Sequence, residues 1–125
     1  EGLSALKAAG YELHVVTSRQ HALEDQTRKF VAREFPDIFT ELHFGNHFGK
    51  EGHKVSKPDM CARIGAKALI DDSTIYAVQC SDAGIPTILF GRYPWNEMDV
   101  TTHDKIERVL GWADVTKVLQ SLINP

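Results

Sequence analysis

Short apolar runs that alternate with helical segments are the feature of this sequence that most limits its fold. Four such runs, at 12–18, 40–45, 68–72 and 86–91, are separated by segments whose apolar residues have helical spacing. This alternation with short connections is typical of βαβ units and predicts a parallel sheet. Because βαβ crossovers are right-handed, the carboxyl ends of the strands meet at one edge, where such sheets bind ligands.

The segments between these runs carry recognisable helix ends. Helices are expected near 3–9, 20–35, 56–65, 73–80 and 115–123. Gly10 is a suitable terminator for the first helix and Gly84 for the fourth. Ser56 is expected to cap the helix that contains Lys57, and Ser73 or Thr74 to cap the next.

The totals limit the classes of partner. A chain of 125 residues suits a single domain over 1–125, and its net charge of −3 disfavours binding to nucleic-acid polymers or membrane surfaces. No run approaches the roughly 18 apolar residues of a membrane-spanning helix. Cys61 and Cys80 lack a CxxC spacing, so we expect buried free thiols and a cytoplasmic location. The start, Glu1-Gly2-Leu3, has neither Met nor a signal pattern, and we expect upstream sequence to have been lost.

Two adjacent carboxylates follow the run at 68–72. Asp71 and Asp72 repel each other at the end of an apolar strand, and a divalent cation would relieve that repulsion. Hard oxygen ligands suit Mg²⁺. The alternative is that one carboxylate caps the following helix while the other is solvated.

A lysine and two hydroxyls occupy the other expected strand and helix ends. Lys57 opens a helix whose dipole attracts anions, so a phosphate there would be held by both, although a solvated side chain is the commoner case. Thr17 and Ser18 could donate to phosphate oxygens, or serve only in a cap or turn. Convergence of these groups with the acidic pair at one sheet edge indicates a site for a phosphate and a metal.

The order of these groups resembles the haloacid dehalogenase (HAD) superfamily. Its second to fourth motifs are similar to His14-Val15-Val16-Thr17-Ser18-Arg19, Val55-Ser56-Lys57-Pro58 and Leu69-Ile70-Asp71-Asp72-Ser73. The resemblance runs from about Leu3 to about Asn96. The phrases 43–47 and 90–96 look closest to a 5′-nucleotidase-like branch, often fungal.

The resemblance implies a Rossmannoid three-layer α/β/α fold and a phosphomonoester hydrolase that works through an aspartyl-phosphate. In such enzymes Thr17 and Ser18 would bind the phosphoryl group, Lys57 would neutralise its charge, and Asp72, with Asp71 adjacent or through water, would hold Mg²⁺. Small phosphorylated substrates are the implied partners.

The family's first motif, Asp-x-Asp, which supplies the nucleophile, does not occur in these 125 residues. We therefore expect this chain alone to be inactive and its sheet to lack the central first strand, between the strands that end at Thr17 and Asp72. Unpaired strand edges favour pairing with another chain, so an oligomer or a missing N-terminal segment is expected. A non-catalytic phosphate- or metal-binding domain is the main alternative. A receiver-type signalling domain is disfavoured because its acidic pair comes first and its lysine last.

The remaining polar and aromatic residues leave roles open. His43, His47 and His53 fit no compact zinc motif, although His43 could line the site edge. His14 is expected to be a surface or structural residue. Tyr93 and Trp95 could stack on a nucleobase or ring, but covering the sheet edge is the preferred interpretation.

Overall fold

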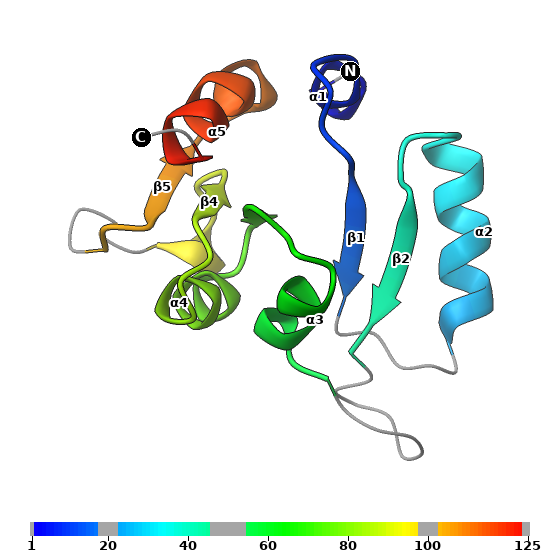
Figure 1. The fold of residues 1–125 in the computed structure, drawn as a ribbon, viewed down its shortest axis with the longest axis horizontal. Helices are drawn as coiled ribbons and strands as arrows, with labels where there is room; N and C mark the ends of the chain where they lie inside the picture. Colours follow the sequence, from blue (N-terminus) through cyan, green and yellow to red (C-terminus); the bar gives the residue numbers. More distant parts are fainter. Residues whose placement is uncertain (1, 18–22, 46–54, 98–102, 124–125) are drawn as a thin grey trace. The chain divides into compact units, whose positions relative to one another are not determined.

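A computed structural model describes residues 2–17, 23–45, 55–97 and 103–123. The chain divides into two compact units, Glu1–Met60 and Cys61–Pro125 (Figure 1). Each unit carries its own parallel sheet, so the two are described separately.

The first unit is built on a two-stranded parallel sheet. Helix α1 (Gly2–Ala8) leads into β1 (His14–Thr17), and α2 (Glu24–Glu34) leads into β2 (Glu41–Phe44). The register runs from His14 opposite Glu41 to Thr17 opposite Phe44, so both strands end level with each other. Helix α3 (Lys57–Arg63) begins in this unit.

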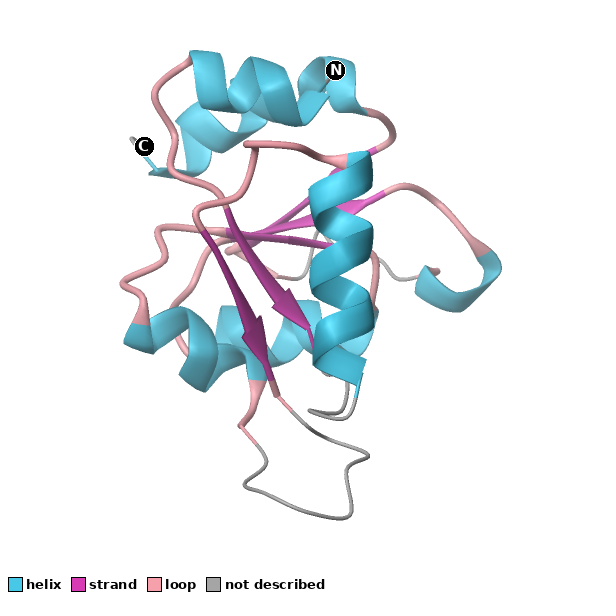
Figure 2. Cartoon of the chain, turned by 90° about the vertical axis from the view of Figure 1, so that its right-hand side faces the viewer, coloured by secondary structure: helices cyan, strands magenta, loops and turns pink. Residues whose placement is uncertain are grey.

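Local sequence explains where α1 ends and what stabilises α2. Gly10 has a φ of +98°, which most side chains avoid, and it ends α1 as expected. Helix α2 lies beside the strand pair (Figure 2), and the Arg28 guanidinium sits 5.6 Å from the centre of the Phe44 ring. Glu24 and Asp25 stand in the first turn of α2, where acidic groups suit the helix dipole. Glu24 also pairs with Arg28 one turn on, at 2.8 Å.

The second unit holds a three-stranded parallel sheet in the order β3-β4-β5. Its elements are β3 (Leu69–Asp71), α4 (Thr74–Asp82), β4 (Thr87–Phe90), the 3₁₀ turn η2 (Pro94–Asn96), β5 (Ile106–Val109), the 3₁₀ turn η4 (Trp112–Asp114) and α5 (Val115–Ile123). Asp71 stands opposite Leu89, so β3 and β4 end at the same edge.

The core of the second unit covers both faces of β4. Ile88 and Leu89 point to opposite faces, and both are completely buried. Leu89 packs with Ala77 of α4 and with Ile106 of β5. Helices α4 and α5 lie on opposite sides of this sheet (Figures 1 and 2). This unit is therefore a three-layer α/β/α arrangement.

The structure confirms the expected α/β class with parallel strands, and it corrects some details. Strand β5 was not expected from the sequence. Cys61 and Cys80 are free and buried on helices, as expected. Among the described residues, hydrogen bonds join β1 to β2 and β3 to β4 in two separate sheets, so the postulated strand between β1 and β3 stays a prediction. None of the described helices has the length and apolar character needed to cross a membrane.

Candidate functional site

The carboxyl end of the β1–β2 pair is joined to the segment that opens α3. The Gly45 N–H donates to the Thr17 carbonyl at 2.7 Å, and the Gly45 carbonyl accepts from Val55 N–H at 2.7 Å. A Cβ built on Gly45 would lie 2.5 Å from the Val55 oxygen and 3.3 Å from the Thr17 oxygen. Because only glycine fits there, Gly45 holds Thr17 and the segment leading to Lys57 at one edge of the first unit.

The start of α3 follows the expected cap. The Ser56 hydroxyl accepts a hydrogen bond from the Asp59 N–H at 3.2 Å, and Pro58 occupies the first turn. Lys57 is the first residue of the helix and is only 8% exposed. A buried ammonium is costly unless acceptors or an anion surround it. The structure therefore places a buried lysine in the same unit as Thr17, two residues after Val55, which donates to Gly45.

The acidic pair lies in the second unit, at the end of β3. Asp71 is the last residue of the strand, and one of its carboxylate oxygens accepts from the Ser73 N–H at 3.0 Å. Asp72 is exposed in the turn that follows. Ser73, not Thr74, caps α4, with its hydroxyl accepting from Tyr76 N–H at 3.4 Å. Because Ser73 caps the helix, Asp72 is not needed as the cap, and it stays exposed directly after β3.

The donor set of this turn fits a magnesium ion. Mg²⁺ is usually held by one or two carboxylates, with water and substrate phosphate completing its shell. Asp71 and Asp72 supply such carboxylates, and Asp72 faces solvent. Within the described ranges, no three His, Cys, Asp or Glu side chains form a ready-made metal cluster. The residues suit a cation bound with substrate more than a closed structural site.

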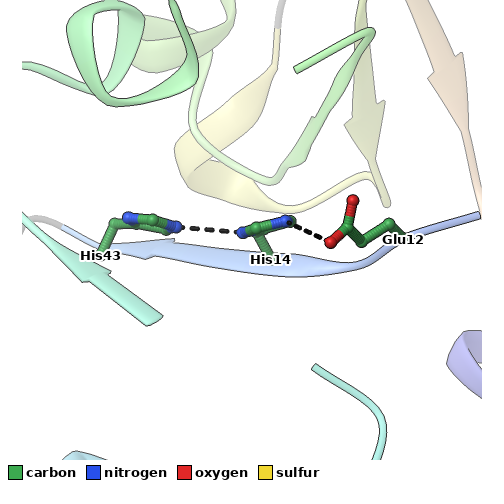
Figure 3. A network of polar contacts seen from close by, with 3 residues as sticks. All are labelled: Glu12, His14 and His43. Carbon is green, nitrogen blue, oxygen red and sulfur yellow. Dashed lines mark hydrogen bonds and ion pairs between the residues drawn. The ribbon is translucent and has the colours of Figure 1, made fainter. Parts of the chain in front are cut away.

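Two histidines form a contact that the sequence did not indicate. His14 Nδ1 lies 3.0 Å from His43 Nε2, and the Glu12 carboxylate lies 3.6 Å from His14 Nε2 (Figure 3). Burial lowers the pKa of His43, His14 and Arg28 lower it further, and Glu41 acts in the opposite direction. The two rings also stack, with centroids 5.3 Å apart and planes inclined by 25°. His43 therefore packs along the strands with His14.

The loop after β4 is held by a polar network that sequence reasoning missed. Asn96 is completely buried; its amide oxygen accepts from Tyr93 N–H at 2.7 Å, and its amide nitrogen donates to the Phe90 carbonyl at 3.2 Å. Arg108 of β5 donates to the Gly91 carbonyl at 2.5 Å and to the Asn96 carbonyl at 2.8 Å. The one available signal was an asparagine next to a conspicuous aromatic pair.

The residues predicted from the sequence are only partly described by the structure, and those that are described belong to two different units. Ser18, His47 and His53 lie outside the described residues. Thr17 and Lys57 belong to the first unit, and Asp71 and Asp72 to the second, so each pair is described only within its own unit.

Comparison with known proteins defines the fold. No protein-family model and no curated protein matches the chain. The chain is similar to the crystal structure of a candidate phosphoglycolate phosphatase from Lactobacillus delbrueckii subsp. bulgaricus, with 17% identity and a TM-score of 0.63 over 99% of its length. The chain spans about half, 52%, of that protein. At this identity the likeness establishes the fold alone, a mixed α/β arrangement with parallel sheets that matches part of a HAD-like fold.

Proposed function

We propose that this chain supplies the phosphate- and magnesium-binding part of a phosphomonoester hydrolase of the HAD type. The structural neighbour is described as a candidate phosphatase, and its fold covers almost the whole chain. The proposed residues stand at the ends of successive elements in the order expected for that fold: Thr17 is the last residue of β1, Lys57 is the first residue of α3, and Asp72 directly follows β3. Small phosphorylated molecules are the proposed substrates, and the 5′-nucleotidase-like branch is the proposed relationship.

Each residue has one role in this proposal. The Thr17 hydroxyl and Ser18 bind phosphoryl oxygens, and Lys57 offsets their charge. Asp72, with Asp71, would hold Mg²⁺, which would polarise the transferred phosphoryl group. The aspartate nucleophile is not among these 125 residues, since no Asp-x-Asp occurs in them.

The observation that carries the proposal is the close packing at Gly45. Thr17 and Lys57 are 40 positions apart in the sequence, so only a tertiary contact can bring their segments together. The two backbone hydrogen bonds of Gly45 fix the end of β1 against the approach to α3. A threonine hydroxyl and a lysine from segments held together at one strand edge suit a dianionic phosphate, because both donate hydrogen bonds and one carries positive charge.

The test uses the protein expressed from its complete reading frame, with phosphate release from a generic phosphomonoester as the assay. Lys57→Ala and Asp72→Asn should each lower turnover roughly 100- to 1,000-fold, by analogy with loss of one oxyanion-hole donor. Lys67→Ala and Asp82→Asn, at exposed positions, are the matched controls and should keep wild-type turnover. The 125-residue chain alone should release phosphate no faster than buffer.

Two results would contradict the proposal. Near-wild-type turnover by Lys57→Ala or Asp72→Asn would remove these residues from the chemistry. Magnesium binding without any turnover by the complete protein would instead favour a non-catalytic phosphate- or metal-binding domain.

A further inference from the structure

The loop after β4 presents two aromatic rings as a stacked pair. The Tyr93 and Trp95 rings have centroids 4.5 Å apart and planes inclined by only 8°. Trp95 remains 62% exposed although one face of its indole is covered by Tyr93. The opposite face of the indole therefore lies open to solvent.

Contacts with Gly91 and a polar network around Asn96 fix the position of the Tyr93–Trp95 pair. The Tyr93 ring lies so close to Gly91 that a Cβ there would overlap it, and Gly91 has a φ of +78°. The Asn96 and Arg108 network described above fixes the backbone on both sides of Trp95. A binding surface that is already ordered loses little conformational entropy when a ligand arrives.

The stacked pair also lies at the carboxyl edge of the sheet in its own unit. The hydrogen bond from Asn96 to the Phe90 carbonyl brings the loop back to the carboxyl end of β4. Asp71 and Leu89 are paired in the neighbouring strands, which lie about 4.8 Å apart. The acidic turn and the aromatic pair therefore follow the ends of adjacent strands.

We propose that Trp95, backed by Tyr93, is a stacking site for the planar aromatic or heteroaromatic ring of a small ligand. A flat π-face accepts any planar ring of similar size. Arg92 and Glu97, on either side of the pair, are exposed and charged, so the apolar surface of this segment is limited to a few residues. Protein interfaces generally need a larger contiguous patch, which favours a small ligand.

The first experiment measures stacking without catalysis. The chain has two tryptophans, so Trp112→Phe leaves Trp95 as the sole indole emitter of these residues. In that background adenosine should quench the Trp95 fluorescence saturably, and ribose should not. Trp95→Ala, assayed by calorimetry in the complete protein, should weaken adenosine binding roughly 5- to 150-fold, equivalent to ~1–3 kcal/mol for one stacked base. Trp112→Phe should bind adenosine like the wild type.

The second experiment tests whether the stacking site serves the proposed hydrolase. It rests on that proposed function, because its substrates are phosphomonoesters that carry a ring. Phenyl phosphate and cyclohexyl phosphate have similar size, but only the first has a planar ring. Trp95→Ala should raise KM for phenyl phosphate roughly 2- to 10-fold, as expected for one aromatic pair, with little change for cyclohexyl phosphate.

The outcomes separate the two proposals. Adenosine binding through Trp95 without phosphatase turnover would support the stacking site and contradict the hydrolase. Turnover that is equal for both phosphates and unaffected by Trp95→Ala, with no quenching by adenosine, would overturn the stacking site and leave the hydrolase standing. A blue-shifted Trp95 emission that resists acrylamide in the complete protein would also overturn it, because protein would then cover the ring.

Discussion

Replacing Asn96 with alanine should destabilise the protein by about 2–4 kcal/mol. The side chain is completely buried and satisfies two backbone groups of its own loop, the Tyr93 N–H and the Phe90 carbonyl. A buried polar group that loses its partner costs roughly 1–3 kcal/mol. The Gly91 carbonyl keeps its hydrogen bond from Arg108, so two groups enter the sum, which would reach roughly 2–6 kcal/mol if both were fully buried. Both lost hydrogen bonds are only partly buried, so water can reach the two groups and the expected total stays in the lower part of that range.

Urea unfolding of the complete protein, followed by circular dichroism, measures this loss as a shift in midpoint at constant m-value. Asn96→Asp is the informative comparison, because it keeps the acceptor for the Tyr93 N–H but sets a carboxylate oxygen against the Phe90 carbonyl. It should also be destabilising. Glu97→Ala, at an exposed neighbouring position, should stay within about 0.5 kcal/mol of wild type. If Asn96→Ala did the same, the amide would not be what holds the loop.

Three further substitutions test other parts of the fold. Gly91→Ala should lower the melting temperature more than Gly84→Ala, since both glycines have positive φ but only at Gly91 would a Cβ meet the Tyr93 ring. Burial lowers the pKa of His43 from its ordinary 6.5, so the folded protein binds fewer protons than the unfolded chain. The stability that neutral His43 contributes above pH 6.5 should fall as the pH drops towards its folded pKa, and His43→Gln should flatten that dependence in urea titrations at pH 5 and 8. Ser73→Ala should cost about 0.5–2 kcal/mol of unfolding free energy in the same assay, because it removes the cap of α4.

Regular elements were predictable because their signals are local. The β-rich runs expected at 12–18 and 68–72 extend one or two residues beyond each end of β1 and β3, as is common at element ends. Val115–Ile123 was expected from its apolar stripe and is observed as α5. Ser73 was one of two possible caps, and the sequence could not choose between adjacent hydroxyl residues.

The missed features depend on contacts between distant residues. Strand β5 has only Ile106 and Val109 as apolar residues, on either side of a charged pair, so its pattern alone does not distinguish it from a loop. Arg108 acquires its role from Gly91, which is 17 residues away, and His14 meets His43 across 29 residues. No local pattern encodes such pairs, and their roles emerge only when the strands are in register.

Both sheets fix the loop beyond the strand end by the same means. Gly45 directly follows β2 and donates to the last residue of β1, while Gly91 directly follows β4 and donates to the last residue of β5. Each glycine carbonyl then accepts from a more distant residue, Val55 N–H for Gly45 and the Arg108 guanidinium for Gly91. At both positions a Cβ would collide with the segment that the glycine supports. The approach to the proposed phosphate-binding lysine and the proposed ring-stacking loop are thus each set by a backbone contact. Substitution of either glycine should therefore alter function through position, without removing any reactive group.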